Sequence, residues 1–187
     1  MVTKENISTK KQLSAGKAVL AILWLIKEAS REKLFSHKYI RLLCKNKNRA
    51  VYRTCISRLS SRKAIKKDYN NIIILTEKGK RMALFAFIEA ELRLFDPSAD
   101  KQQWDGGWRL IFFDIPEKKR LFRDYLRKVL KIIGFKEFQK SIWAYPYPVP
   151  AFLKEFIFYE EIKPYVRFIS TSGFDGDKNL RELFELD

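Results

Sequence analysis

The side chains best suited to bind a charged partner are twelve lysines and arginines between positions 33 and 67, a segment that contains no acidic residue. A solvated helix surface normally mixes both signs of charge, so this segment indicates a polyanionic partner. The 187-residue chain carries 38 Lys+Arg against 22 Asp+Glu and a formal net charge of +16. Residues 1–95 hold 22 of the cations and 7 of the acids, so nearly all the excess lies there. Nucleic acid is the first partner to consider, and an anionic membrane surface the second.

Side chains for nucleophilic or metal chemistry are sparse. His37 is the only histidine, and Cys44 and Cys55 lack the spacing of a zinc site or a disulfide framework. We therefore expect no catalysis and no cofactor.

The apolar segments are too short for a membrane protein. The longest uninterrupted one, Ala18 to Ile26, has nine residues, whereas a membrane-spanning helix needs about 20. Lys27 and Glu28 close it at once, without the small-residue cleavage pattern of a signal peptide. We expect a cytoplasmic protein in a reducing compartment, with no membrane partner.

The elements that must position the cationic segment are three helices and a hairpin. Ser14 is the expected N-cap of the first helix, and two short predicted β-strands flank a turn that contains two asparagines. Three helices followed by a two-stranded hairpin make a winged helix-turn-helix. The expected ranges are helices over 14–29, 31–43 and 46–62, strands over 64–68 and 72–75, and a turn at 69–71.

The third of these helices is predicted to bury one side and expose the other. Val51, Cys55 and Leu59 recur every four residues and define its expected buried face. Arg49, Arg53, Ser57 and Ser60 project from the opposite side. A recognition helix meets base edges at its N-terminal end. Hairpin lysines can contact phosphates or enter the minor groove. The predicted DNA-binding residues are Lys47, Asn48, Arg49, Tyr52, Arg53 and Ser57 on or before the helix, and Lys66 and Lys67 on the hairpin.

The second half of the chain predicts a second domain of different type. A further helix leads from the hairpin to Phe95, and residues 96–107 have the proline and glycine content of a linker. Beyond it, apolar strands alternate with two helices in the order β-α-β-β-α-β, which is typical of a ferredoxin-like domain. The expected class is thus α+β, with a DNA-binding domain over 1–95, a linker over 96–107, and a dimerisation domain with a C-terminal tail over 108–187.

Several segments resemble a known family. NRAVYRTCISRLSSRKAIKKDYNNIIILTEKGKRM resembles winged-helix repressors, except that Lys63-Ala64 stands where a glycine is usual between helix and wing. WRLIFFDIPEKKRLFRDYLRKVLKIIGF and FQKSIWAYPYP resemble the central domain of the PaaX-type transcriptional repressors, which is similar to CRISPR-associated protein two. The resemblance covers roughly residues 14–170 and implies a repressor. The sequence does not indicate which small-molecule effector, if any, would regulate it.

We interpret the chain as a sequence-specific transcriptional regulator that binds double-stranded DNA as a homodimer. The main alternative is a metal-dependent nuclease or a CRISPR-associated accessory protein, in which Asp114 carboxylates from two copies would hold a magnesium ion. The resemblance to CRISPR-associated protein two implies that role for Asp114. A third possibility is a winged helix that binds another protein.

Overall fold

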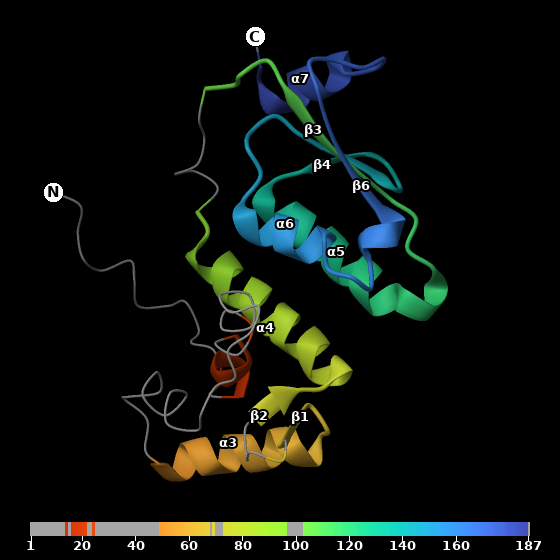
Figure 1. Ribbon diagram of the computed structural model, residues 1–187. Helices are drawn as coiled ribbons and strands as arrows, with labels where there is room; N and C mark the ends of the chain where they lie inside the picture. The colour runs from red at the N-terminus through yellow and green to blue at the C-terminus, as the bar shows by residue number, and fades with distance from the viewer. Residues whose placement is uncertain are drawn as a thin grey trace, which may run out of the picture. The chain divides into compact units, whose positions relative to one another are not determined.

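Figure 1 shows the computed structural model, in which the described parts of the chain are residues 14, 16–21, 24, 49–67, 69, 73–96 and 103–186. The chain divides into two compact units, Met1–Arg93 and Leu94–Asp187. Helices and antiparallel strands occur in both, which confirms the mixed α and β class. The separate roles assigned to the two parts and to the 96–107 linker stay predictions. Within the described ranges, no helix is long and apolar enough to cross a bilayer.

The first unit, unit 1, begins with a capped helical segment. Residues 16–21 are helical, and the N–H of Lys17 donates to the Ser14 Oγ at 3.4 Å, as expected for an N-cap. The Lys17 ammonium pairs with Glu89 at 2.5 Å and so joins this segment to a later helix. The later elements of unit 1 are α3 (Arg49–Ser61), β1 (Ile65–Lys67), β2 (Ile73–Leu75) and α4 (Glu77–Leu94).

The predicted third helix and the hairpin after it are both present. Strands β1 and β2 run antiparallel, with Ile65 opposite Leu75. The predicted second helix, 31–43, lies outside the described residues, as do Asn70 and Asn71 of the predicted turn. The complete winged helix therefore stays a prediction.

The buried face of α3 differs from the expected one at its first turn. Cys55 and Leu59 are buried, but Val51 is 40% exposed. Each step of four residues turns the side chain by about 40° around the axis, so Val51 lies about 80° from Leu59. A strict four-residue repeat therefore drifts out of the core, and the prediction for Val51 was wrong.

Helix α3 ends in a Schellman motif built on a lysine. Lys63 adopts a left-handed backbone conformation with φ of 55°. Its N–H donates to the Ser60 carbonyl at 2.8 Å, and the Ala64 N–H donates to the Leu59 carbonyl at 2.9 Å. The usual glycine is thus missing from the sequence, but the helix stops in the usual way.

The start of α4 is locked against this helix end. The Thr76 hydroxyl donates to the Lys63 carbonyl at 2.6 Å and accepts a hydrogen bond from the Gly79 N–H at 3.1 Å. The Thr76 N–H also donates to the Ala64 carbonyl at 3.0 Å. These bonds close the hairpin on α3 and fix where its strands leave the helix.

The second unit, unit 2, is a four-stranded antiparallel sheet with helices on both sides (Figure 1). The strand order is β4-β5-β3-β6, so β3 and β5 lie in the middle. This order and the β-α-β-β-α-β connection confirm the predicted ferredoxin-like domain. Its elements are β3 (Trp108–Phe113), η2 (Glu117–Lys119), α5 (Arg120–Ile133), β4 (Lys136–Gln139), β5 (Ile142–Tyr145), α6 (Ala151–Ile157), η3 (Lys163–Tyr165), β6 (Val166–Thr171) and α7 (Lys178–Phe184).

The two faces of this sheet are covered differently. Helices α5 and α6 pack together through Phe122 and Phe156, and Arg127 of α5 lies over the ring of Phe113. On the other face, Leu180 of α7 forms a small core with Trp108 and two neighbours. Successive residues of β3 point to opposite faces, which is why both sides of this strand are apolar. The position of α7 on the sheet was not predicted.

Candidate nucleic-acid interface

The outer side of α3 is a polar strip. Arg53, Ser57 and Ser60 are all exposed, on the side of the helix away from Cys55 and Leu59. Spacings of four and three residues keep these three side chains within about 60° around the axis and about 10 Å along it. Such a strip can lie along a groove of a nucleic acid.

An open depression of about 530 Å³ lies where this strip meets the hairpin. Lys67, the last residue of β1, contributes a second cation to it, whereas its neighbour Lys66 is exposed but does not line it. Alternation along a strand explains this difference, because successive side chains point to opposite faces. The depression is lined by Arg53, Ile56, Ser57, Ser60, Ser61 and Lys67.

The lining of this depression has one sign of charge. It contains two cations, three serines, one isoleucine and no carboxylate. Among the described residues, no acidic side chain pairs with Arg53 or Lys67. Cationic and hydroxyl side chains are the usual partners of phosphate oxygens. The arrangement is therefore suited to an anionic backbone.

The structure brings together only part of the predicted set. Arg53, Ser57 and Lys67 meet in the depression. Ser60 lies on the predicted outer side but was not among the predicted binding residues, and its seven-residue spacing from Arg53 was the available signal. Ile56 and Ser61 flank the strip on the same side of α3, and Lys67 joins them because the hairpin folds back, which helical periodicity does not reveal. Outside the described part of the chain are Lys47, Asn48 and the side chains of Arg49 and Tyr52.

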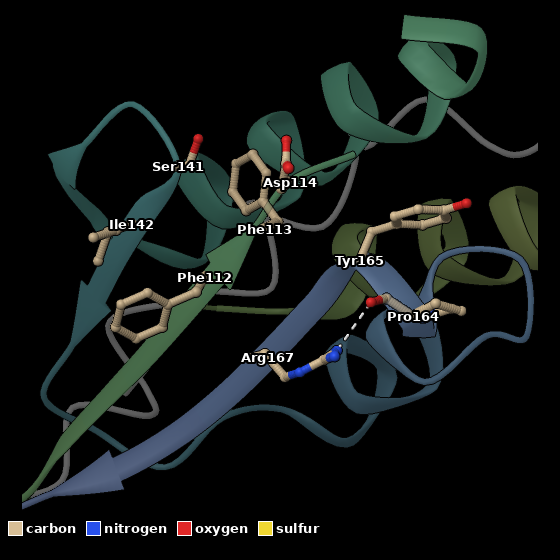
Figure 2. Close-up of a pocket in the computed structure, with 8 residues that line it drawn as sticks. All are labelled: Phe112, Phe113, Asp114, Ser141, Ile142, Pro164, Tyr165 and Arg167. Atoms are coloured by element: carbon tan, nitrogen blue, oxygen red, sulfur yellow. Dashed lines mark hydrogen bonds between the residues drawn. The ribbon is translucent and has the colours of Figure 1, made fainter. Parts of the chain in front are cut away.

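Asp114 lies in a separate pocket of about 380 Å³ in unit 2 (Figure 2). Two backbone hydrogen bonds of 2.9 Å join residues of its lining, from the Phe113 N–H to the Ser141 carbonyl and from the Asp114 N–H to the Tyr165 carbonyl. Figure 2 shows Arg167 turned to the Pro164 carbonyl oxygen, with which it forms a 3.0 Å hydrogen bond. The Asp114 carboxylate is exposed, and it caps neither of the helical segments that follow.

The residues of this pocket do not fit a metal ion in one chain. Asp114 is the one carboxylate in the lining, and the Arg167 guanidinium in the same lining opposes a bound cation. The described residues contain no group of three or more His, Cys, Asp or Glu side chains that could hold a metal. Mg²⁺ keeps several waters and is held by one or two carboxylates, so a site in one chain is opposed by the Arg167 guanidinium beside a single Asp114.

An ion pair fixes the segment that enters the sheet of unit 2. Arg109 of β3 donates to Asp105 at 2.7 Å and to the Pro146 carbonyl at 2.7 Å. The hydrogen bond from Arg109, assisted by the Gly107 N–H, lowers the pKa of Asp105 from 3.8 to about 2. The same pair raises the pKa of Arg109. Both groups are thus charged at neutral pH, and they hold the approach to β3 in place.

A second group of paired charges, formed by Lys17, Glu89 and Arg93, lies in unit 1. Burial raises the pKa of Glu89, but hydrogen bonds from Lys17 and Arg93 outweigh that effect, so the pKa is lowered. Arg93 follows Glu89 by one helical turn and pairs with it at 2.6 Å. This cluster stabilises the packing between the first helical segment and α4.

Comparison with known proteins gives one family match. Residues 101–183 match the family described as the PaaX protein central Cas2-like domain. No curated protein sequence matches the chain. Among solved structures, the uncharacterized protein Rv0674 from Mycobacterium tuberculosis is similar, with 15% sequence identity and a TM-score of 0.37. The similar region covers 91% of this chain and 66% of the Rv0674 chain, slightly less than two thirds of its length. The PaaX family is associated with transcriptional regulation. The match confirms the resemblance for residues 101–183, which are similar to the central Cas2-like domain of PaaX proteins.

Proposed function

We propose that the chain is a transcriptional regulator that binds duplex DNA through unit 1. The observation that carries this proposal is the depression beside α3, in which two cations and three serines meet no carboxylate. The association of the PaaX family with transcriptional regulation supports the same conclusion. The charge of residues 1–95 supplies the long-range attraction that brings such a protein to DNA.

The side chains around α3 divide between two tasks. A helix of 13 residues is about 20 Å long and 10–12 Å wide, which suits a major groove about 12 Å wide. Arg53 projects from its exposed side and has the planar fork that recognises guanine O6 and N7. Lys66, Lys67 and the serines contact phosphates, which sets orientation rather than sequence. The proposed base-reading set also includes Lys47, Asn48, Arg49 and Tyr52 at the N-terminal end of the helix.

We infer that two copies of the chain associate through unit 2. Helix α7 packs at the Trp108 end of β3 on the sheet face that is turned away from α5 and α6, which we call the outer sheet face. On this face Ile169 of the edge strand β6 lies opposite Leu110 and is 45% exposed, and Phe112 and Ile142, which lie opposite each other, are half-buried. A second copy would remove this surface from water. Two-fold symmetry would then present two copies of α3 to two half-sites of one operator.

The test of DNA binding titrates the full chain against a labelled 30-base-pair duplex of mixed sequence at several salt concentrations, followed by fluorescence anisotropy. We expect the affinity of the wild type to fall steeply as salt rises, because counterions are released on binding. Lys67→Ala should weaken binding to every sequence and reduce the slope of log K against log salt by about 0.9.

Arg58→Ala is the matched control, because Arg58 is exposed on the same helix but does not line the depression. This variant should bind more like the wild type than Lys67→Ala does. Binding by the wild type that is weak and insensitive to salt would contradict the proposal. Equal losses in the two variants would contradict the assignment of the depression.

A further inference from the structure

The near neutrality of unit 2 conceals a strong separation of charge. Residues 94–187 carry 16 Lys+Arg and 15 Asp+Glu. Nine of these cations and only two of the acids lie between positions 118 and 140, the segment that contains α5, β4 and the turn after it. The remainder of the unit holds seven cations and thirteen acids. One part of this small domain is therefore basic and the rest acidic.

Four of these cations form one surface, which we call the α5 cationic surface. Arg127, Lys128 and Lys131 lie within about 100° on α5, over little more than one turn. Lys140 joins them because the Arg127 guanidinium donates to its carbonyl oxygen at 3.2 Å. The Arg127 guanidinium lies over the Phe113 ring, with its central carbon 5.7 Å from the ring centre. The members of the surface are thus Arg127, Lys128, Lys131 and Lys140.

The acidic side chains near this surface either pair with other arginines or form no ion pair with the surface. Asp124 pairs with Arg120 at 3.2 Å, and Glu117 pairs with Arg123 at 2.7 Å. Glu137 is exposed on the edge strand β4, and no ion pair joins it to the surface among the described residues. The four cations therefore remain without a carboxylate partner in the part of the chain that the structure describes.

The clustering of like charges on α5 is unfavourable for the stability of the helix. Like charges one turn apart destabilise a helix, and Arg127 and Lys131 stand four residues apart. The negative end of the helix dipole offsets this cost only in the last turn, where Lys131 lies. Asp124 stands one turn before Arg127 and Lys128 but pairs with Arg120 instead, so an external anion accounts for the charges of Arg127 and Lys128 better.

We propose that the α5 cationic surface is a second phosphate-binding surface, by which unit 2 contacts the backbone of duplex DNA. The proposal rests on the DNA binding proposed for unit 1 and adds a contact from the other unit. Flexible lysines make point-charge contacts with phosphates, so this surface would raise affinity without reading sequence.

The apolar side chains beside this surface argue against a membrane as the partner. Leu121 and Ile132 are exposed on α5, but eleven residues separate them, about 16 Å along the axis. A helix that binds a bilayer surface presents a continuous apolar face to the lipid. The apolar face of α5 is instead buried in the core of the domain through Leu126, Val129, Leu130 and Ile133.

The experiment compares three full-length proteins on a 40-base-pair duplex of mixed sequence. The test variant is Lys128→Gln/Lys131→Gln/Lys140→Gln, and the matched control is Lys154→Gln/Lys163→Gln/Lys178→Gln, which removes three exposed lysines from the acidic part of the same unit. We expect the test variant to reduce the slope of log K against log salt by between two and three, since each lost phosphate contact lowers it by about 0.9. The control should leave the slope within one of the wild-type value.

Two further measurements separate the possible failures. Replacing the same three lysines by arginine keeps the charge and should preserve the wild-type slope. A test variant that matches the control overturns this inference while the DNA binding of unit 1 stands. A wild type without salt-dependent DNA binding overturns the proposed function itself. Binding to phosphatidylserine vesicles that is lost in the test variant, with DNA binding unchanged, overturns DNA as the partner.

Discussion

The carbonyl oxygen of Ala64 occupies the space that a Cβ atom on Gly79 would need. Ala64 follows the end of α3, and Gly79 lies in the first turn of α4, so this close approach seats one helix against the other. The hydrogen bonds of Thr76 to the same segment reinforce the contact. The placement of β1, and hence of Lys67 beside α3, depends on this junction.

Gly79→Ala should therefore destabilise unit 1, by about 1–3 kcal/mol as for other overpacked sites. Alanine is the better helix former, so propensity alone would give the opposite sign. Gly16→Ala is the matched control, because no atom of the described residues lies within 4 Å of the Cβ it would add. Urea unfolding of both variants measures the difference. A Gly79→Ala protein as stable as the Gly16→Ala protein would contradict the close approach.

The left-handed residue at the end of α3 gives a second prediction. Lys63 has φ of 55°, a conformation that costs a side-chain-bearing residue about 1 kcal/mol or more relative to glycine. Lys63→Gly should raise the free energy of unfolding by about that amount, whereas Lys63→Ala should not. Thermal unfolding of the two variants tests this. Equal effects of glycine and alanine would show that charge, not backbone conformation, is responsible.

Acid should weaken unit 2 through Asp105. The folded-state pKa of Asp105 is lowered from 3.8 to about 2, so its contribution to stability is complete above pH 3.8 and disappears as the pH falls towards 2. Asp105→Asn should lower stability at neutral pH and flatten the pH dependence over this interval. Asp175→Asn, an exposed acid in the turn before α7, serves as the control. Unfolding free energies measured from pH 5 to pH 2 decide the matter.

Dimerisation through the outer sheet face predicts twice the chain mass of 22.2 kDa in light scattering. Ile169→Asp places a charge on the uncovered apolar surface and should give a monomer at micromolar concentration. Leu183→Asp makes the same change at a more exposed position on α7, and it should leave the dimer intact. A monomeric wild type, or dimers in both variants, would contradict this interface.

The sequence predicted the elements of unit 2 well because their periodicities are strong. The apolar run at β3 favours a strand and the four-residue repeat of α5 favours a helix, and Gly134 ends α5 in a left-handed conformation. The packing of α7 against Trp108 could not be predicted in this way. Periodicity shows that a helix has an apolar side, but not which residues that side contacts.

The candidate site was predictable to a smaller extent. Arg53 and Ser57 follow from helical spacing alone, and so does the exposure of Ser60. The meeting of Ser61 and Lys67 depends on the direction in which the hairpin leaves α3. That direction is set by Lys63 in a conformation that lysine rarely adopts, and by tertiary contacts of Gly79 that a sequence pattern does not display.

The most direct test of the central claim is selection of bound duplexes from a random-sequence library by the full chain, followed by sequencing. The wild type should enrich one motif with two related half-sites. Arg53→Ala should lose the preference for one base pair in each half-site, by about 1–3 kcal/mol, while Arg58→Ala should keep it. A wild type that enriches no motif, or an Arg53→Ala protein that enriches the wild-type motif unchanged, would contradict sequence-specific recognition by α3.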